Sequence, residues 1–376
     1  MIDLLLIAVM MVAAILLLWP FLFYPAILRW LPKQPLHADG EVPSSASLLF
    51  CAYNEAASLP GKIANIRALK ARHPSLQVLA FNDGSADETG ALLDQASDVL
   101  HVIHGPGRSG KAHGMKLLAA IATGDVLIFS DANVMLDEGA IDALLPYYRD
   151  AQVGGVLGSL HYGGAQSSAS ASVGALYWRI EEQLKDLESR TGNVMGADGS
   201  IFSIRRSLYP DFPDSVLDDL TVSMAVVFAG KRLIKAKNVI AREMMVSRRE
   251  DEYRRKVRIA TRSWHTHQHL RPQLRAMTRL DRFKYTSRKI IRWFGAAWIG
   301  IGALAALAFA WRVSPIAAIA MLAAVLFFGL LGAMFRRGPI ASIMDLLLAY
   351  VATLKGVLRA MRGQTFTVWA PAKSRD

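Results

Sequence analysis

An almost unbroken apolar run opens the chain, and it constrains the architecture more than any other sequence feature. From Ile2 to Trp30 it is interrupted mainly by Asp3, Arg29 and two prolines. The run is longer than the apolar core of a signal peptide, and it has neither a basic segment before it nor a small-residue cleavage site. Because about 20 apolar residues span a bilayer, we predict a transmembrane helix over roughly residues 3–24.

The C-terminal part of the chain is apolar as well. Two segments, about 293–311 and 316–335, are separated by a short polar break and indicate two further transmembrane helices. A third segment, 339–358, contains Asp345 and Lys355. Because a carboxylate is costly to bury in lipid, the sequence favours a helix that lies in the membrane interface or re-enters. A full third span is the alternative.

The basic residues predict the orientation in the membrane. The formal net charge is +12, and Arg29 and Lys33 follow the first apolar run, while Arg336 and Arg337 follow the third. Lys and Arg beside a span mark its cytoplasmic side, so we expect a multi-pass protein of the bacterial inner (cytoplasmic) membrane with its soluble domain inside. The chain has no basic and aromatic nucleic-acid-binding module, so we expect membrane lipids rather than nucleic acid as the partner of this charge.

A single cysteine, Cys51, excludes an internal disulfide. A cytoplasmic location agrees with this, because disulfides belong to oxidising compartments. We interpret Cys51 as a small buried apolar residue at the end of a strand.

The middle of the chain alternates short apolar runs with helical segments. This alternation predicts an α/β domain with a mostly parallel sheet, in which ligands bind beyond the carboxyl ends of the strands. The strands are expected at Ser47–Ala52, Gln77–Asn82, Val99–His104 and Asp125–Ser130, and helices at Ser58–Arg72 and Asp87–Ala96.

Polar clusters follow three of these expected strands. Tyr53 and Glu55 come after the first strand, Asp83 after the second, and Asp131 and Asn133 after the fourth. Each cluster alone is ordinary turn chemistry. In this order, however, all three converge on one rim of a parallel sheet, so the sequence predicts a ligand site there.

The segment Gly105–Lys111 suggests a competing function. It fits most of the phosphate-binding pattern G-x-x-x-x-G-K-[ST], between a strand and a helix, which would make the chain a P-loop ATPase subunit of a membrane transporter. The next residue is Ala112, which has no hydroxyl to bind magnesium. The pattern therefore lacks a metal ligand, and we keep the ATPase only as an alternative.

Adjacent carboxylates, Asp218 and Asp219, interrupt an otherwise apolar stretch farther along the chain. They could simply begin a helix, where the dipole favours negative charge. Together with the strand-end clusters, they indicate instead a general base whose pKa is raised by burial and by the neighbouring charge. Asp198 lies in a second polar motif, Gly-Ala-Asp-Gly-Ser.

These motifs together resemble those of family 2 glycosyltransferases with the GT-A fold, in the membrane-bound branch that includes cellulose, chitin and hyaluronan synthases. The resemblance covers roughly residues 46–265. It implies a Rossmann-like, mostly parallel sheet and an inverting transfer of a sugar from a nucleotide-sugar, UDP-linked in our expectation, to a lipid-linked or polysaccharide acceptor. Exopolysaccharide or capsule synthesis, beside other polysaccharide-assembly proteins, is the implied setting.

The resemblance also assigns roles to individual residues. Asp219 takes the place of the catalytic base with Asp218 beside it, and Asp198 that of the acceptor-side aspartate. Asp131 and Asn133 stand where the family binds a divalent cation, Mg²⁺ or Mn²⁺, although an amide is a weaker ligand than a carboxylate. The residues that match the nucleotide-sugar site are Ala52, Tyr53, Glu55, Asp83, Lys111 and Asp131.

The synthases carry a further motif, Q-x-x-R-W, that is only partly present. Arg255 and Arg258 match its spacing, with Ile259 where the family has tryptophan, and Trp264 offers a shifted alternative on the acceptor side. Without the tryptophan platform we expect transfer of one sugar, with a processive synthase as the alternative within the family. A binding protein with a decayed site is a third alternative, supported only by Asn133.

Two other features remain open after the resemblance is considered. Trp369 lies in a tail that is either a mobile segment near the site or an interfacial anchor. His265, His267 and His269 would share one face of a strand, but the helical composition around them scatters them, which argues against a dedicated metal site.

The sequence therefore predicts six regions. They are a membrane helix (1–31), a proline-containing linker (32–45), the GT-A domain (46–265), a basic interfacial segment (266–292), two membrane helices (293–336), and an interfacial or third membrane helix with a cytoplasmic tail (337–376).

Overall fold

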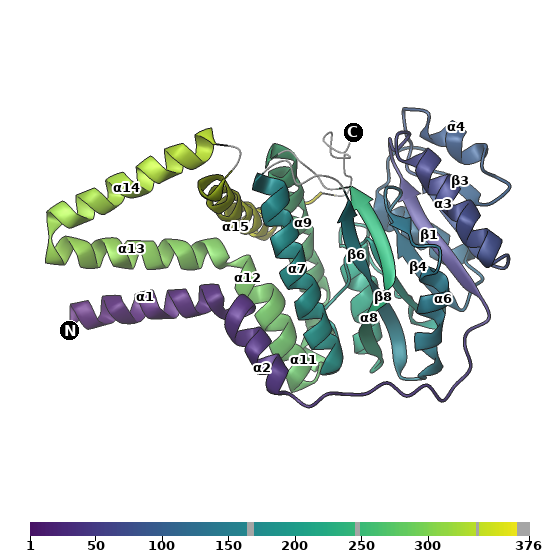
Figure 1. Cartoon of the computed structure of the whole chain (residues 1–376), viewed down its shortest axis with the longest axis horizontal. Helices are drawn as coiled ribbons and strands as arrows, with labels where there is room; N and C mark the ends of the chain where they lie inside the picture. Colours follow the sequence, from purple (N-terminus) through teal and green to yellow (C-terminus); the bar gives the residue numbers. More distant parts are fainter. Residues whose placement is uncertain (164–168, 245–248, 336–337, 367–376) are drawn as a thin grey trace.

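The computed structural model describes residues 1–163, 169–244, 249–335 and 338–366. The basic pair Arg336–Arg337 and the tail residue Trp369 lie outside these ranges. The described residues form a mixed sheet covered by helices and a group of long apolar helices that extends away from it (Figure 1).

The sheet has the order β3-β2-β1-β4-β7-β6-β8-β5. The first four of these strands are parallel, and β7 is antiparallel to both of its neighbours. This arrangement confirms the predicted mostly parallel α/β sheet. The strands are β1 (Ala46–Ala52), β2 (Gln77–Asn82), β3 (His101–His104), β4 (Val126–Ser130), β5 (Met135–Leu136), β6 (Val153–Gly163), β7 (Ile201–Arg205) and β8 (Arg232–Met244).

The four strands expected from the sequence are all present. β3 begins two residues later than expected, because the N–H groups of Val99 and Leu100 both bond to the carbonyl of Ala96 and complete the preceding turn. The helices over the sheet are α3 (Leu59–Arg72), α4 (Thr89–Asp94), α5 (Lys111–Ile121), α6 (Ala140–Leu144), η2 (Leu145–Arg149), α7 (Ala169–Arg190), η3 (Arg206–Leu208) and α8 (Asp218–Phe228).

The two faces of the sheet bury two separate apolar clusters. Alternate residues of β1 point to opposite faces, so Leu48 packs in the cluster that contains α3, whereas Leu49 packs in the cluster that contains α5. Cys51 is buried in the second cluster, as interpreted from the sequence. A Cβ atom at Gly114 of α5 would come within 2.8 Å of the Cys51 sulfur. This close approach holds α5, and therefore the first residue of α5, against the sheet.

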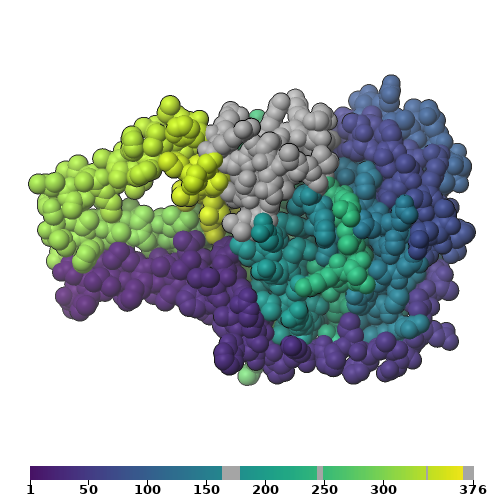
Figure 2. Space-filling model, viewed as in Figure 1, coloured from purple at the N-terminus to yellow at the C-terminus, as the bar shows by residue number. Residues whose placement is uncertain are grey.

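Four helices are long and apolar enough to cross a membrane, and they cover Ile2–Trp30, Gly295–Val313, Pro315–Met334 and Pro339–Met361. The first comprises α1 (Ile2–Leu18), η1 (Trp19–Phe23) and α2 (Tyr24–Trp30), and the others are α13, α14 and α15 in turn. α1, α13 and α14 project away from the sheet, and α1 lies beside α13 (Figures 1 and 2). At their far end Arg312 donates to Asp3 over 2.6 Å.

Between the sheet and these long helices lies a group of helices that includes the expected basic segment, residues 266–292. The group consists of α9 (Arg249–His269), α10 (Arg271–Ala276), α11 (Arg279–Tyr285), η4 (Thr286–Ile290) and α12 (Ile291–Trp293). The expected domain boundary at 265/266 falls inside α9. The linker after α2 runs along the domain, where the N–H groups of Gln34 and Gly40 bond to the carbonyls of Arg190 and Arg149.

The last helix, α15, runs alongside α9 in the same direction. Arg249 at the start of α9 forms an ion pair with Asp345. Farther along, the hydroxyl of Thr261 donates to the carbonyl of Gly356 over 3.0 Å. A Cβ atom at Gly356 would lie 2.5 Å from the carbonyl oxygen of Val257, so only glycine permits this contact. The Asp345 carboxylate, which argued against burial of this helix in lipid, is therefore paired with an arginine of α9.

Candidate active site

The carboxyl ends of β1, β2 and β4 meet at one edge of the sheet, as predicted. The N–H of Asp83, which follows β2, donates to the carbonyl of Ala52 at the end of β1 over 2.9 Å. β4 pairs with β1 on its other side and ends immediately before Asp131. The three polar strand ends are thus brought together by parallel pairing alone.

Lys111 joins two parts of this edge that are distant in sequence. Its ammonium lies 2.6 Å from a carboxylate oxygen of Asp131 and 3.7 Å from one of Asp218. Burial opposes the charge of Lys111, but Asp131, Asp218 and Asp219 more than offset it and raise the pKa of this lysine. Lys111 is the first residue of α5 and Asp218 the first residue of α8, so the N-termini of two helices meet at this site.

The two adjacent carboxylates differ in environment. Asp218 is buried and lies beside Lys111. Asp219 is partly exposed. Burial, and then the charge of Asp218, raise the pKa of Asp219 to about 6, although Lys111 and a hydrogen bond from the N–H of Leu220 work in the opposite direction. A carboxylate with that pKa is able to accept a proton near neutral pH.

The Gly196–Ser200 loop closes over the Lys111–Asp131 pair. A Cβ atom at Gly199 would lie 2.9 Å from the Lys111 ammonium and 3.4 Å from the Asp131 carboxylate. Within the loop, Asp198 forms an ion pair with Lys185 and accepts a hydrogen bond from the hydroxyl of Ser200. Burial opposes the charge of Asp198, but Lys185 above all lowers its pKa to about 2.

The segment that resembles an ATP-binding loop is bound by the protein itself. The N–H groups of Ser109 and Gly110 donate to Asp83 over 2.7 and 3.0 Å. Phosphate-binding loops need these N–H groups for the nucleotide. Asp83 is fully buried, so its oxygens serve this loop in the observed conformation. Neither the Lys111 contacts nor these donors fit a P-loop ATPase.

Tyr53 and Glu55 lie at the outer end of the same edge. The guanidinium of Arg108 stacks 3.5 Å from the centre of the Tyr53 ring. Glu55 accepts from the hydroxyl of Ser58 over 3.0 Å, and its N–H donates to the hydroxyl of Thr89 over 2.8 Å. An aromatic ring stacked on a guanidinium provides a flat polar surface of the kind on which a nucleotide base can stack.

Asp131 and Asn133 are the residues here that could hold a cation. The Asn133 amide donates to Glu243 over 2.9 Å, which leaves its carbonyl oxygen as the ligand. Among the described residues, no three His, Cys, Asp or Glu side chains gather to hold a metal ion by themselves. This donor set fits a hard cation that takes its remaining ligands from water and from phosphates, which is the usual mode for Mg²⁺.

The residues expected on the acceptor side do not form one cluster as the strand-end residues do. Arg255 pairs with Glu252 over 2.9 Å on the same helix, α9, which also carries Arg258. Trp264 packs in an aromatic cluster with Trp293 and Phe294, at ring-centre distances of 5.8 and 6.2 Å. In this position it supports the junction of α9 with α12.

α9 holds the loop before α8 through residues that the sequence did not single out. Arg262 donates to the carbonyl of Val216, and the N–H of Leu217 donates to the hydroxyl of Thr266 over 2.8 Å. These bonds position the residues directly before Asp218. The sequence gave no local sign of them, because their partners are almost fifty residues away.

Lys289 is another residue that the sequence analysis missed. Its ammonium lies 3.9 Å from where a Cβ of Gly196 would be, so it reaches the loop of Asp198 from η4. Burial, and then the charge of Arg288, lower its pKa to about 8. Lys289 therefore loses its proton more readily than an ordinary lysine, and its positive charge lies close enough to Asp219 to interact with it.

The three histidines lie at the end of α9, and the helix separates them as expected. His265 bonds to the carbonyl oxygen of Gln364 over 2.8 Å, whereas His267 stacks on Tyr285 with ring centres 5.8 Å apart. In the described part of the chain they do not form a metal-binding group.

Comparison with known proteins agrees with this arrangement. Residues 47–212 match the Glycosyl transferase family 2 model, from β1 to a point just before the acidic pair. Among solved structures, a mannosyltransferase from Pyrobaculum calidifontis, PcManGT, in complex with GDP-Man and Mn²⁺ is similar over 97% of this chain and 100% of its own, with 17% identity and a TM-score of 0.72. This likeness shows the fold.

A second structure, GalNAc-T7 with UDP, GalNAc and Mn²⁺, is similar over 55% of this chain and 45% of its own, with 14% identity and a TM-score of 0.42, and we base no argument on it. No curated protein sequence matches the chain. The family match over residues 47–212, the shared fold and the strand-end carboxylates agree with one another, and we conclude that this chain is a glycosyltransferase with the GT-A fold.

Proposed function

We propose that the protein transfers one sugar, with inversion, from a UDP-linked nucleotide-sugar to a lipid-linked or polysaccharide acceptor at the membrane. The observation that carries this proposal is the contact of Lys111 with both Asp131 and Asp218, which brings the end of β4 and the start of α8 into one cluster. A nucleotide diphosphate on one side and an acceptor on the other would both reach this cluster.

The residues divide the chemistry between them. Asp219 takes the proton from the acceptor hydroxyl as that oxygen attacks the anomeric carbon, because it is partly exposed and its pKa is raised to about 6. Lys111 neutralises charge on the departing diphosphate, and Asp218 keeps the lysine in place. Tyr53 and Arg108 offer the stacking surface for the base.

A divalent cation, Mg²⁺ or Mn²⁺, belongs to the proposal. Asp131 and the carbonyl oxygen of Asn133 would hold it, and the ion would supply positive charge to the diphosphate of the donor. A chelator is therefore expected to abolish transfer, and Mg²⁺ or Mn²⁺ to restore it. Full activity in excess chelator would contradict this part of the proposal.

The membrane setting follows from the helices. We propose that α1, α13 and α14 cross the cytoplasmic membrane of a bacterium, and that α15 lies with α9 at its inner surface. The pairing of Asp345 with Arg249 and the parallel course of the two helices support an interfacial α15. Arg29 and Lys33, which follow the first helix, support an active site in the cytoplasm, where nucleotide-sugars are made.

The test is nucleotide release by the purified full chain in detergent. A panel of UDP-sugars and GDP-sugars, GDP-mannose included, is offered with Mn²⁺ or Mg²⁺ and a bacterial lipid extract. We expect release from one donor, a product extended by one sugar, and loss of release in Asp219→Asn by a factor of about 10²–10⁴, with donor affinity nearly unchanged.

Asp142→Asn serves as the matched control, since Asp142 is an exposed carboxylate that pairs with Arg72 on the surface. It should behave like the unmodified protein. If Asp219→Asn also lost donor binding, the residue would be structural and the assignment of the base wrong. A ladder of long products would identify a processive synthase instead.

A further inference from the structure

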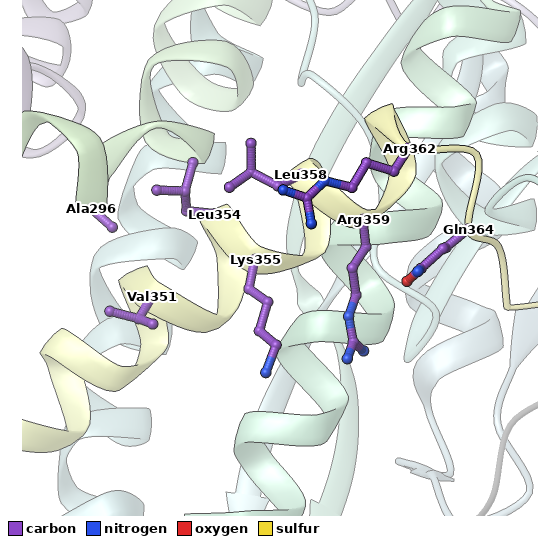
Figure 3. A pocket seen from close by; sticks show the side chains of 8 residues that line it. All are labelled: Ala296, Val351, Leu354, Lys355, Leu358, Arg359, Arg362 and Gln364. Carbon is purple, nitrogen blue, oxygen red and sulfur yellow. The ribbon is translucent and has the colours of Figure 1, made fainter.

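A groove lies where the beginning of α13 meets the last turns of α15. Its volume is about 460 Å³, and Ala296 of α13 forms one side of it. α15 and Arg362, the residue directly after it, contribute two kinds of side chain to the lining: apolar Val351, Leu354 and Leu358, and cationic Lys355, Arg359 and Arg362 (Figure 3). The groove thus combines an apolar wall with three positive charges.

These charges lie on one side of the C-terminal end of α15, and no acidic partner contacts them in the part of the chain that the structure describes. Lys355, Arg359 and Arg362 are spaced four and three residues apart, which puts them next to one another on a helix. Among the described residues, no carboxylate forms a salt bridge with any of them, and the ammonium of Lys355 lies 5.6 Å from the centre of the Tyr253 ring. An anion in the groove would relieve the repulsion between the three.

The position of the groove indicates the source of that anion. Ala296 is the second residue of α13, a helix long and apolar enough to cross a membrane, so the groove lies at the end of this helix nearest the sheet (Figure 1). At that level of a bilayer, lipid phosphates lie beside the ends of their hydrocarbon chains. Cations bind the phosphates, and an adjacent apolar wall accepts the chains.

We propose that this groove binds an anionic phospholipid of the membrane. The phosphate would lie between Lys355, Arg359 and Arg362, and the first part of an acyl chain would lie against Val351, Leu354 and Leu358. The site goes beyond the proposed transfer reaction, because neither the donor nor the acceptor is needed to fill it.

The bound lipid would also stabilise the helix that supports the active site. α15 contacts α9 at Gly356, where the carbonyl accepts from Thr261 over 3.0 Å. Five residues farther along α9, Thr266 accepts from the N–H of Leu217, directly before the acidic pair. A lipid that fixes α15 therefore acts on α9, and through it on the loop that leads into α8 and Asp219.

The experiment measures lipid retention by native mass spectrometry of the full chain in mixed micelles with equal amounts of phosphatidylglycerol and phosphatidylcholine. We expect the unmodified protein to retain phosphatidylglycerol about tenfold in excess. The variant Lys355→Met, Arg359→Gln, Arg362→Gln should retain the two lipids equally. The water-soluble headgroup glycerophosphoglycerol, which has no acyl chains, should not displace the bound lipid.

The matched control removes the same number of charges from the exposed basic segment, as Arg275→Gln, Arg279→Gln, Arg282→Gln. It should keep the preference for phosphatidylglycerol. Equal retention of both lipids by the unmodified protein would overturn the proposal, as would an equal loss in the control, which would show diffuse attraction by surface charge. Displacement by inorganic phosphate or by the free headgroup would show a site for small anions. Circular dichroism of each variant confirms that it is folded.

Discussion

Two charged clusters lie on either side of the Gly196–Ser200 loop, and they differ in charge balance. In the first, the single ammonium of Lys111 faces Asp131, Asp218 and Asp219. In the second, which joins α7 to η4 and α12, Arg288 and Arg292 are matched by Glu181 and Glu188.

The difference shows which cluster is built to react. The balanced cluster has no need of a ligand, and its buried pairs hold α7 against η4 and α12. The first cluster has an excess of negative charge, which a cation or a proton would neutralise. Surplus charge, rather than the number of ionised groups, distinguishes the candidate active site from a structural network.

Removing the one cation of the first cluster should have the largest effect. Lys111→Met leaves three carboxylates together with no cation in contact with them, and we expect transfer to fall about a thousandfold, the equivalent of roughly 4 kcal/mol. The acidic limb of the pH–rate profile should also move to higher pH, because Lys111 lowers the pKa of Asp219. Nucleotide release between pH 5 and pH 9 measures both. Lys70→Met on α3 is the control. If the acidic limb of the Lys111→Met profile did not move, Lys111 would have no influence on the pKa of Asp219.

Breaking the balanced cluster should affect stability and leave the chemistry intact. Arg288→Met leaves Glu181 and Glu188 buried without this partner, and we expect the free energy of unfolding to fall by about 3 kcal/mol. The folded fraction should still transfer sugar at a nearly unchanged rate. Thermal unfolding in detergent, together with activity per folded molecule, provides the check. A stable but inactive variant would show that this cluster takes part in catalysis.

The pH dependence of the unmodified protein tests the surplus of negative charge directly. The pKa of Asp219 is raised to about 6, so the base is protonated as the pH falls through that value. Transfer should fall about tenfold for each pH unit below about 6. The raised folded-state pKa also means that Asp219 favours unfolding when ionised, so its contribution to stability improves as the pH falls. A rate that stays level down to pH 4.5 would exclude this carboxyl as the base.

A methyl group beside the Lys111–Asp131 pair should give the smallest effect. Gly199→Ala places a Cβ 2.9 Å from the Lys111 ammonium, and the flexible lysine must move by a few tenths of an ångström. We expect transfer to fall about three- to tenfold with stability nearly unchanged, which corresponds to roughly 1 kcal/mol. Gly139→Ala, where a Cβ would meet nothing within 4 Å, is the control. Equal activity of the two variants would mean that the Gly196–Ser200 loop does not pack closely against Lys111 and Asp131.

The sequence predicted the fold and the strand ends because these depend on local pattern. Apolar runs gave the four parallel strands, and parallel pairing brought Asp83 and Asp131 to one edge without further information. Asp218 begins α8, so the acidic pair does stand at a helix N-terminus, which the sequence analysis gave as the alternative interpretation. The roles assigned to Asp83, Asp131 and Asp219 in the reaction remain proposals.

Contacts between distant segments could not be predicted in the same way. Lys289 reaches the Gly196–Ser200 loop, and Arg262 donates to the carbonyl of Val216. The sequence around Lys289 or Arg262 does not indicate either partner. Trp264 was expected on the acceptor side, yet it packs against Trp293 because α12 turns back towards α9. Such contacts depend on how helices pack, and many different packings satisfy the same apolar pattern.

The parallel contact of α15 with α9 has a consequence for when the enzyme becomes active during its synthesis. The ribosome makes residues 339–361 after the sheet, the acidic pair and the three earlier helices that are long enough to cross a membrane. Until then Val257, Ala260 and Thr261 of α9 have no neighbour at the place that Gly356 will occupy. A nascent chain therefore acquires the contact that supports α9, and through α9 the loop before Asp218, only after α15 has been made.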